Sequence, residues 1–401
     1  MEMLKTKKEV NALGLLFAFT YMVSYMTRTN FGAIISEMER ATQYPRELLS
    51  VALTGSFITY GIGQVISGVI GDRVSPKRLV TLGLILTTIM NLLIPLCPSP
   101  YLMIVCWCIN GFAQSFMWPP IVKLMSALLS SEDYQRTTVK VNWGGQIGTI
   151  AVYLLGSLII SLLGWKWVFI GCALVGGTTV FLWNRLACDI STQKSAVAVG
   201  QKISGKVLFS PVMLFVMFSI ILMGMLRDGV TTWMPSYISE TYDLGSAVAI
   251  LTGVILPIFG ILSFQAASAL YRKKFTNPLI CGGLIFALGA VAAGLLFVFT
   301  GKHAVLSVLF SALLTGCMHG VNLLLVCMLP AYFKKFGNVS TASGVINACT
   351  YIGSAVSAYG IAVLSTVIGW NYTVLLWAAI ALIGAVICFV CAKPWHKTFA
   401  D

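Results

Sequence analysis

Residues 68–78 read GVIGDRVSPKR and form a short, basic turn between two apolar runs, residues 48–70 and 79–97. Each run is long enough to cross a hydrocarbon core of about 30 Å as a helix. Short cytoplasmic loops of membrane proteins are rich in Lys and Arg, so this turn indicates a helical hairpin connected on the cytoplasmic side. The stretch predicts an all-α integral membrane protein.

The rest of the chain repeats this pattern. Of its 401 residues, 58% are hydrophobic and only 10% are charged, which leaves too few polar side chains to cover a soluble globule. The first apolar run is too long for a cleaved signal peptide, so we expect it to remain as a helix. We expect twelve transmembrane helices, at residues 12–35, 48–70, 79–97, 101–129, 137–163, 167–186, 208–238, 246–270, 278–299, 305–333, 342–368 and 373–392.

The net charge of +13 could indicate nucleic-acid binding, but its placement follows membrane topology instead. Three basic residues lie within predicted spans, namely Arg28, Lys123 and Arg227. Those expected outside are Arg40, Arg46, Lys166 and Lys302, and all the others fall on the cytoplasmic side if both termini are cytoplasmic. We therefore expect a multi-pass protein of the cell membrane, in contact with the lipid bilayer and not with nucleic acid.

The two halves of the sequence echo each other. Arg28 and Arg227 are 199 residues apart, and so are Arg73 and Arg272. Asn142, Gly148 and the pair Gly164-Trp165 correspond to Asn347, Gly353 and Gly369-Trp370, each 205 residues later. Such repeats are typical of transporters built from duplicated halves, with the substrate site near the midplane. We predict two pseudo-symmetric six-helix bundles, residues 1–186 and 208–401, joined by a polar cytoplasmic linker at residues 187–207.

The turn at residues 68–78 carries a further prediction. Gly68 permits another helix to approach closely, and Asp72 can pair with a cation or cap the N-terminus of a neighbouring helix. The glycine followed by Asp72-Arg73 and further basic residues resembles the cytoplasmic loop motif of the major facilitator superfamily. We interpret Gly68, Asp72 and Arg73 as a conformational latch; a plain basic turn is the alternative.

Two arginines lie in the middle of apolar runs, where a charge costs about 2.5–3.5 kcal/mol even on the insertion scale. Arg28 shares one helix face with Tyr21 and Tyr25, since the three are spaced by four and three residues. This stripe suits a polar cavity better than lipid. Guanidinium groups bind phosphate oxygens in a two-pronged geometry, so Arg28 and Arg227 at equivalent positions of the repeat indicate one shared anionic ligand.

Several motifs resemble one family, the organophosphate:phosphate antiporters. They are Tyr-x-x-Arg-x-Asn-Phe at 25–31, Tyr60, the Asp72-Arg73 loop, Gln114 ahead of Trp118-Pro119-Pro120, Asn142, Arg227 with Trp233, and Tyr351. The resemblance implies the fold of the major facilitator superfamily, with Arg28 and Arg227 clamping a phosphoryl group and with Tyr25, Tyr60, Asn142 and Tyr351 lining the pathway. The chain departs from the family at Thr29, Gln64, Gly145 and His319, which make the expected site less cationic.

The other residues that we expect at the substrate site are Tyr21, Gln64, Trp118, Lys123 and His319. Lys123 could be a gate or could reach the cytoplasmic interface, and His319 could titrate or make a single hydrogen bond. Asp228 could carry a coupling proton, bind a substrate ammonium or pair with a nearby cation. Its neighbour Arg227 points about 100° away around the helix, so pairing between them is not required.

We therefore expect a secondary transporter that exchanges an organic phosphate ester, such as glycerol-3-phosphate or a sugar phosphate, for inorganic phosphate by alternating access. Proton-coupled uptake of a carboxylate such as a sugar acid is the first alternative, and a membrane sensor of sugar phosphates is the second. The sequence contains no nucleophile-base set, nucleotide loop or metal-binding cluster, so we expect neither an enzyme nor a cofactor or metal. We expect a monomer whose partners are small anions.

Overall fold

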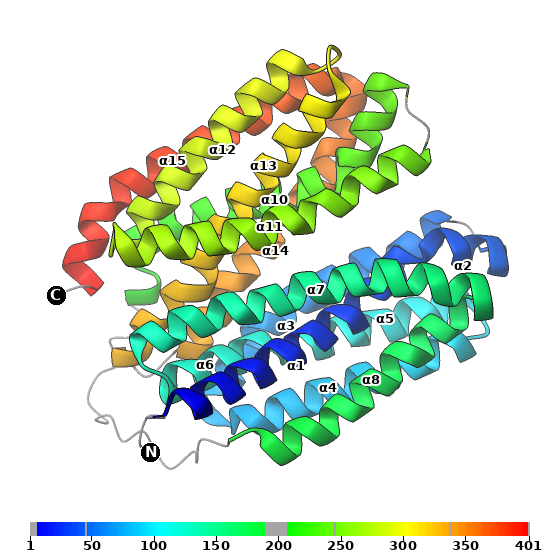
Figure 1. Cartoon of the computed structure of the whole chain (residues 1–401), viewed down its shortest axis with the longest axis horizontal. Helices are drawn as coiled ribbons and strands as arrows, with labels where there is room; N and C mark the ends of the chain where they lie inside the picture. The colour runs from blue at the N-terminus through cyan, green and yellow to red at the C-terminus, as the bar shows by residue number, and fades with distance from the viewer. Residues whose placement is uncertain (1–5, 45, 189–206, 244–245, 337–338, 400–401) are drawn as a thin grey trace. The chain divides into compact units, whose positions relative to one another are not determined.

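The computed structural model describes residues 6–44, 46–188, 207–243, 246–336 and 339–399, and these are almost entirely helical (Figure 1). The long helices are α1 (Lys7–Ala33), α3 (Arg46–Arg73), α4 (Pro76–Leu93), α5 (Pro100–Gln114), α6 (Trp118–Leu128), α7 (Ser131–Leu163), α8 (Trp165–Leu186), α10 (Pro211–Tyr242), α11 (Ser246–Lys273), α12 (Pro278–Phe299), α13 (Ala304–Asn322), α14 (Val339–Val367) and α15 (Gly369–Phe399). A short helix, α2 (Ile35–Thr42), follows α1 and is not predicted by the apolar pattern.

Local sequence signals fix where many of these helices begin. The helices α4, α5, α10 and α12 all start with proline, which lacks the N–H group that the first helical turn cannot pair. Directly before α4 and α10, the hydroxyls of Ser75 and Ser210 accept hydrogen bonds from backbone N–H groups of the first turn. Such caps stabilise a helix end by about 1 kcal/mol each.

The predicted all-α membrane fold is confirmed. Eleven helical segments within the described ranges are long and apolar enough to cross a membrane, and α14 covers the remaining predicted run, residues 342–368. The predicted span at 79–97 ends in a short 3₁₀ turn, η1 (Ile94–Leu96), and two other spans change their helix geometry well inside their bounds. The span at 101–129 breaks between α5 and α6, because Pro119 and Pro120 supply no N–H groups to the preceding turn. The span at 305–333 continues beyond α13 as a π-helical turn, η2 (Leu323–Met328), and a 3₁₀ segment, η3 (Leu329–Phe336).

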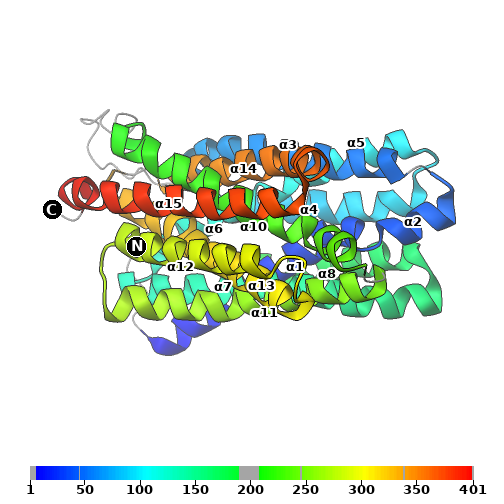
Figure 2. The same cartoon turned by 90° about the horizontal axis from the view of Figure 1, so that it is seen from above.

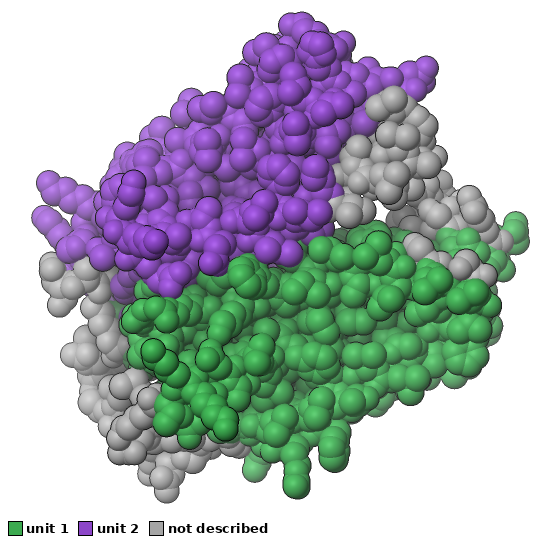
Figure 3. Space-filling model, viewed as in Figure 1, with its two compact units in different colours: residues 1–201, 333–348 green, residues 202–332, 349–401 purple. Residues whose placement is uncertain are grey.

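The chain forms two compact units (Figure 3). Unit 1 comprises Met1–Gln201 and Phe333–Ala348, and unit 2 comprises Lys202–Tyr332 and Cys349–Asp401. Most of the linker predicted at residues 187–207 lies outside the described residues. The first turns of α14 belong to unit 1 although they lie in the C-terminal half of the sequence, because they pack on α3. The division into halves at 1–186 and 208–401 stays a prediction.

Within each unit the helices pack as long, nearly side-by-side rods (Figure 2). In unit 1, α1 packs against α7 and α8, α3 packs against α5, and α4 packs against α8 and α5. In unit 2, α12 packs against α15 and α13, while α10 packs against the same two helices from another side. Both arginines of the repeat lie on the first long helix of their unit, Arg28 on α1 and Arg227 on α10.

Candidate functional site

In unit 1 the guanidinium of Arg28 lies over two tyrosine rings. Its Cζ atom is 4.2 Å from the ring centre of Tyr25 and 4.9 Å from that of Tyr60 on α3. A guanidinium attracts an aromatic face electrostatically, and stacking engages its flat face while the five N–H donors lie in the plane. Arg28 is half-buried. At these distances both rings stabilise the cation electrostatically, and a guanidinium is the planar fork that suits an oxyanion.

The aromatic stripe predicted on α1 continues away from Arg28. The rings of Tyr21 and Tyr25 meet edge to face at 5.0 Å, and Tyr21 lies 5.1 Å from Trp118 on α6. Trp118 is fully buried, and its indole nitrogen has no hydrogen-bond partner among the described residues. The structure thus brings Tyr21, Tyr25, Arg28, Tyr60 and Trp118 together through these ring contacts. Their role in binding a substrate stays a prediction.

A neighbouring face of α1 is fixed by a buried network of amides and hydroxyls. Gln114 on α5 accepts a hydrogen bond from Ser24 at 2.5 Å and donates to the Thr27 hydroxyl at 2.9 Å and to Thr87 of α4 at 2.8 Å. One turn along, the Asn30 amide donates to Asn91 at 2.7 Å. Hydrogen bonds between apolar helices fix their rotation, because an unpaired amide in such surroundings is costly.

Two residues of the family motifs, Asn30 and Gln114, belong to this network and connect helices to one another. Asn30 of α1 contacts Asn91 of α4, and Gln114 of α5 contacts the hydroxyls of Thr27 and Thr87. Asn110 donates to the Thr27 carbonyl at 3.1 Å. The sequence signal that could have revealed the network is the recurrence of amide residues within apolar runs, namely Asn30 on α1, Asn91 on α4, and Asn110 and Gln114 on α5.

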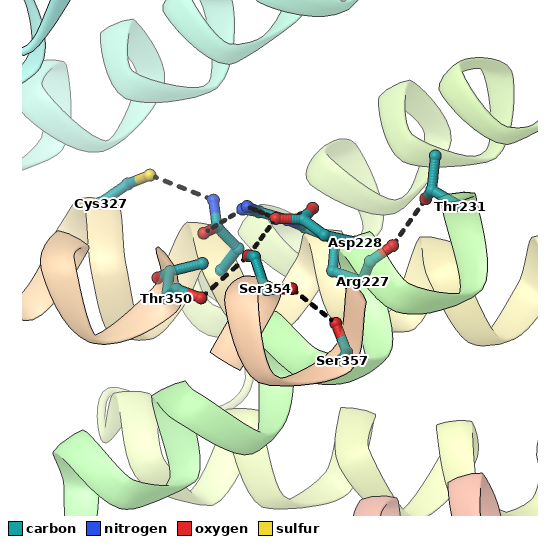
Figure 4. A network of polar contacts seen from close by, with 8 residues as sticks. Arg227, Asp228, Thr231, Cys327, Thr350, Ser354 and Ser357 are labelled. Atoms are coloured by element: carbon teal, nitrogen blue, oxygen red, sulfur yellow. Dashed lines mark hydrogen bonds and ion pairs between the residues drawn. The ribbon is translucent and has the colours of Figure 1, made fainter. Parts of the chain in front are cut away.

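In unit 2 the surroundings of the second arginine are polar and charged (Figure 4). Asp228 accepts two hydrogen bonds from Arg227, from Nε to Oδ1 at 2.7 Å and from Nη2 to Oδ2 at 2.8 Å. Ser354 of α14 donates to the same carboxylate, and Asn322 of α13 accepts from Arg227 Nη1 at 2.9 Å. Of the three roles left open for Asp228, the structure shows pairing with a cation, and the cation is its sequence neighbour.

Asn322 is the site residue that sequence reasoning missed. It is the last residue of α13, and the π-helical turn η2 begins directly after it. Its amide nitrogen lies 3.7 Å from the Cys327 sulfur across that turn. A π-helical turn widens the backbone and is frequent at functional sites. Here it follows the residue that contacts the guanidinium, a placement that apolar periodicity does not reveal.

The remaining predicted site residues lie in several places. His319, also on α13, is half-buried, and its ring lies 5.5 Å from that of Phe264. Asn142 donates to the Thr138 carbonyl of its own helix at 2.9 Å. Tyr351 lies on α14 in unit 2, partly exposed. Their roles as substrate contacts stay predictions.

Gln64 is fully buried on α3, and neither of its amide atoms has a hydrogen-bond partner among the described residues. The backbone carbonyl oxygen of Gln64 faces α14 of the same unit. A Cβ atom added to Gly344 of α14 would come within 2.2 Å of this oxygen. Only glycine permits this approach. Gln64 therefore lies where α3 and α14 pack most closely.

The predicted latch residues meet the start of α14. Asp72 accepts hydrogen bonds from the backbone N–H groups of Ser340 and Thr341, at 3.1 and 2.8 Å, and from the Thr341 hydroxyl at 2.6 Å. A carboxylate at this end of a helix is stabilised by the helix dipole. A Cβ atom at Gly68 would lie 2.8 Å from the Ser340 carbonyl oxygen, so the glycine allows the contact.

Lys123 lies beside this cap rather than beside Arg28. Its Nζ donates to the Gly71 carbonyl at 2.7 Å and is 4.0 Å from the Asp72 carboxylate. Arg73, the neighbour of Asp72, is exposed. Within the described ranges no three His, Cys, Asp or Glu side chains cluster as a metal site would require. The described residues thus include one partly buried arginine in each unit and a helix N-terminus capped by a carboxylate.

Comparison with known proteins places the chain in a family. The profile described as Major Facilitator Superfamily matches residues 17–358. The chain belongs to the major facilitator superfamily. It is therefore a membrane transporter and not an enzyme, as the sequence predicts.

Its relatives include proteins named for phosphorylated compounds. The chain is 23% identical to the membrane sensor protein UhpC of Escherichia coli over 378 residues, which covers 88% of this chain and 85% of the relative. It is 23% identical to a probable hexose phosphate transport protein of Chlamydia trachomatis, covering 92% and 87%. It is equally similar, at 23%, to the glycerol-3-phosphate transporter of Bacillus subtilis, covering 88% and 85%. The predicted resemblance to this group is confirmed.

Solved structures confirm the fold. The fucose:proton symporter FucP of E. coli superimposes with a TM-score of 0.77, at 12% identity, over 96% of this chain and 99% of that one. A bacterial homologue of the iron transporter ferroportin, in an outward-facing state, gives a TM-score of 0.70 at 11% identity, with the same coverage. At such low identity these similarities concern the fold alone.

Proposed function

We propose that the protein exchanges an organic phosphate ester, such as glycerol-3-phosphate or a hexose phosphate, for inorganic phosphate by alternating access. Arg28 in unit 1 and Arg227 in unit 2 are the anion-binding groups in this proposal. The observation that carries it is the half-buried Arg28 guanidinium, whose Cζ atom lies 4.2 and 4.9 Å from the ring centres of Tyr25 and Tyr60. A guanidinium is a planar cation that can make two-pronged contact with phosphoryl oxygens.

The relatives support the phosphoryl group as the recognised feature, because a hexose phosphate transport protein and a glycerol-3-phosphate transporter are among them. A phosphate ester carries a charge of about −1.5 to −2 near neutral pH, which calls for more than one cationic partner. We place the protein in the cell membrane as a monomer, with both termini in the cytoplasm, in accordance with the distribution of Lys and Arg.

We further propose that Asp72 stabilises one conformation of the cycle by capping α14, with Gly68 permitting the contact and Arg73 as part of the same turn. Breaking the cap exposes the first N–H groups of α14 and removes a favourable charge–dipole interaction. This gives the carrier a contact that can be made in one state and released in another.

Counterflow into proteoliposomes tests the exchange. We expect labelled phosphate to enter vesicles loaded with phosphate or glycerol-3-phosphate much faster than empty vesicles, because an exchanger returns across the membrane only when loaded. Equal rates into loaded and empty vesicles would contradict obligatory exchange. Competition by phosphate, glycerol-3-phosphate, hexose phosphates, phosphoglycerates and sugar acids then identifies the preferred anion.

Two other functions make different predictions for this assay. Proton-coupled uptake of an organic acid is favoured by the carboxylate of Asp228 beside Arg227, and it predicts uptake driven by a pH gradient without competition by phosphate. A sensor function is favoured by the similarity to UhpC, and it predicts that the protein binds a sugar phosphate but supports no flux.

A further inference from the structure

The Nε and Nη2 donors of Arg227, which form the edge that could bind an anion, already contact a carboxylate. Asp228 takes the Nε and Nη2 donors at 2.7 and 2.8 Å, and the Asn322 amide oxygen takes Nη1 at 2.9 Å. Carboxylate and phosphate bind the same fork of N–H groups. An incoming anion that uses this edge therefore competes with a carboxylate that is attached to the next residue of the same helix.

The groups around Asp228 determine its protonation once it has lost Arg227. Ser354 of α14 donates a hydrogen bond to its carboxylate, and His319 of α13 is the other titratable group whose charge acts on it. Without the guanidinium, the carboxylate would keep one hydroxyl donor and lie next to a bound anion. A negative charge close to a carboxylate favours its protonated form.

Water can reach this carboxylate. The Asp228 side chain is 34% exposed, whereas that of Arg227 is 13% exposed. The proton source is therefore water at the accessible side of Asp228, and the step is simple protonation: a carboxylate oxygen gains a proton from hydronium, which becomes water. Ser354 of α14 contacts Asp228, and Asn322 of α13 contacts Arg227. Each member of the ion pair can therefore keep one hydrogen bond when the pair separates.

We propose that Asp228 is a displaceable counter-ion and a proton site: an anion that binds Arg227 displaces the Asp228 carboxylate, which then takes up a proton, so that anion and proton bind together. This proposal rests on the proposed function, because it requires that Arg227 bind the transported anion. It couples the anion to a proton, because the charge of Arg227 is offset by the Asp228 carboxylate until an anion replaces that carboxylate.

Proton uptake by the purified wild-type protein is the first test. Glycerol-3-phosphate is added in weakly buffered detergent solution between about pH 7 and 8, where a phosphate ester with a second pKa of about 6 is already largely ionised. We expect proton uptake that saturates together with anion binding. By linkage, the affinity for glycerol-3-phosphate should fall by up to about tenfold for each unit by which the pH rises. Binding without proton uptake, and with an affinity independent of pH, would overturn the proposal.

The variant Asp228→Asn keeps the shape of the side chain but neither its charge nor its proton. We expect it to bind glycerol-3-phosphate about tenfold more tightly than wild type at about pH 8, because Arg227 no longer has an ionised competitor. Its binding should take up no proton beyond those of the ligand. Glu240→Gln is the matched control, since Glu240 is a carboxylate of the same helix that accepts from Trp370 at 2.7 Å, and it should retain wild-type proton uptake.

The outcomes separate this proposal from the proposed function. If wild type binds glycerol-3-phosphate or phosphate and catalyses counterflow without proton uptake, Asp228 is not a proton site and the exchange function stands. If neither compound binds, the proposed function fails and the counter-ion proposal fails with it. Should Asp228→Asn not fold, the wild-type proton uptake and its pH dependence decide the question alone.

Discussion

Arg28 and Arg227 hold corresponding positions in the sequence repeat, yet the two units surround them differently. In unit 1 the guanidinium rests on the rings of Tyr25 and Tyr60, and a neighbouring face of its helix is fixed by neutral amides. In unit 2 the guanidinium is paired with Asp228 and contacts Asn322. A duplicated sequence can thus preserve a cation while its partners change from aromatic faces to a counter-ion.

The difference matters for the electrostatics of transport. Each of the two arginines carries one positive charge. The ion pair with Asp228 weakens the electric field of Arg227 at distances larger than the pair itself. Arg227 becomes available only in exchange for its present partner. Substitutions around the two arginines should therefore affect anion binding to different extents.

The largest effect should come from replacing either arginine by lysine. Arg28→Lys and Arg227→Lys keep the charge but lose the planar fork, and we expect each to lower counterflow by about 100-fold. Initial rates in phosphate-loaded proteoliposomes measure this. Arg136→Lys is the control, because Arg136 belongs to an exposed pair with Glu132 on α7. Near-normal flux in either site variant would refute recognition by the guanidinium fork.

The buried network on the neighbouring face of α1 should give the next largest effect. Gln114→Leu removes the amide that contacts Ser24, Thr27 and Thr87, so we expect unfolding to become easier by about 1–3 kcal/mol. Thermal denaturation in detergent measures the loss. Thr178→Val is the control, since Thr178 is exposed and bonds only to its own helix at Leu174. An unchanged midpoint for Gln114→Leu would show that the network does not hold α1.

The aromatic support of Arg28 can be separated from the tyrosine hydroxyl. Tyr25→Leu removes the ring under the guanidinium, and we expect phosphate affinity to fall about fivefold, in line with a cation–π interaction of ~1 kcal/mol. Tyr25→Phe keeps the ring and should bind nearly as well as wild type. Equal losses in both variants would indicate that the hydroxyl, and not the ring, is required.

The smallest effect is expected at Asn322. Asn322→Ala frees one donor of Arg227 but leaves the pair with Asp228 in place, so phosphate affinity should change by no more than about threefold. Isothermal titration of the purified protein measures it. A loss as large as that of Arg227→Lys would mean that the amide itself binds the anion.

Much of the fold could be read from the chain. The apolar runs predicted all the long membrane helices, because the length needed to cross a bilayer is a local property of the sequence. The breaks within two spans, at Pro119-Pro120 and at η2, were not predicted from hydropathy, which is nearly blind to backbone geometry. The family motifs located Arg28 and Asp72 correctly on their helices, but they did not show that Gln114 and Asn30 connect neighbouring helices.

The sequence by itself determined the class of protein, its spans and the two intramembrane arginines, since each follows from composition, run length and the cost of a charge in lipid. Only the tertiary structure decided the partners. Asp228 pairs with its sequence neighbour Arg227, because the long arginine side chain can fold back towards the carboxylate. Asn322, which is 95 residues later in the chain, contacts the same guanidinium. Asp72 meets α14 more than two hundred and sixty residues away. Contacts of this kind depend on how helices pack, and sequence periodicity specifies a helix face but not its neighbour.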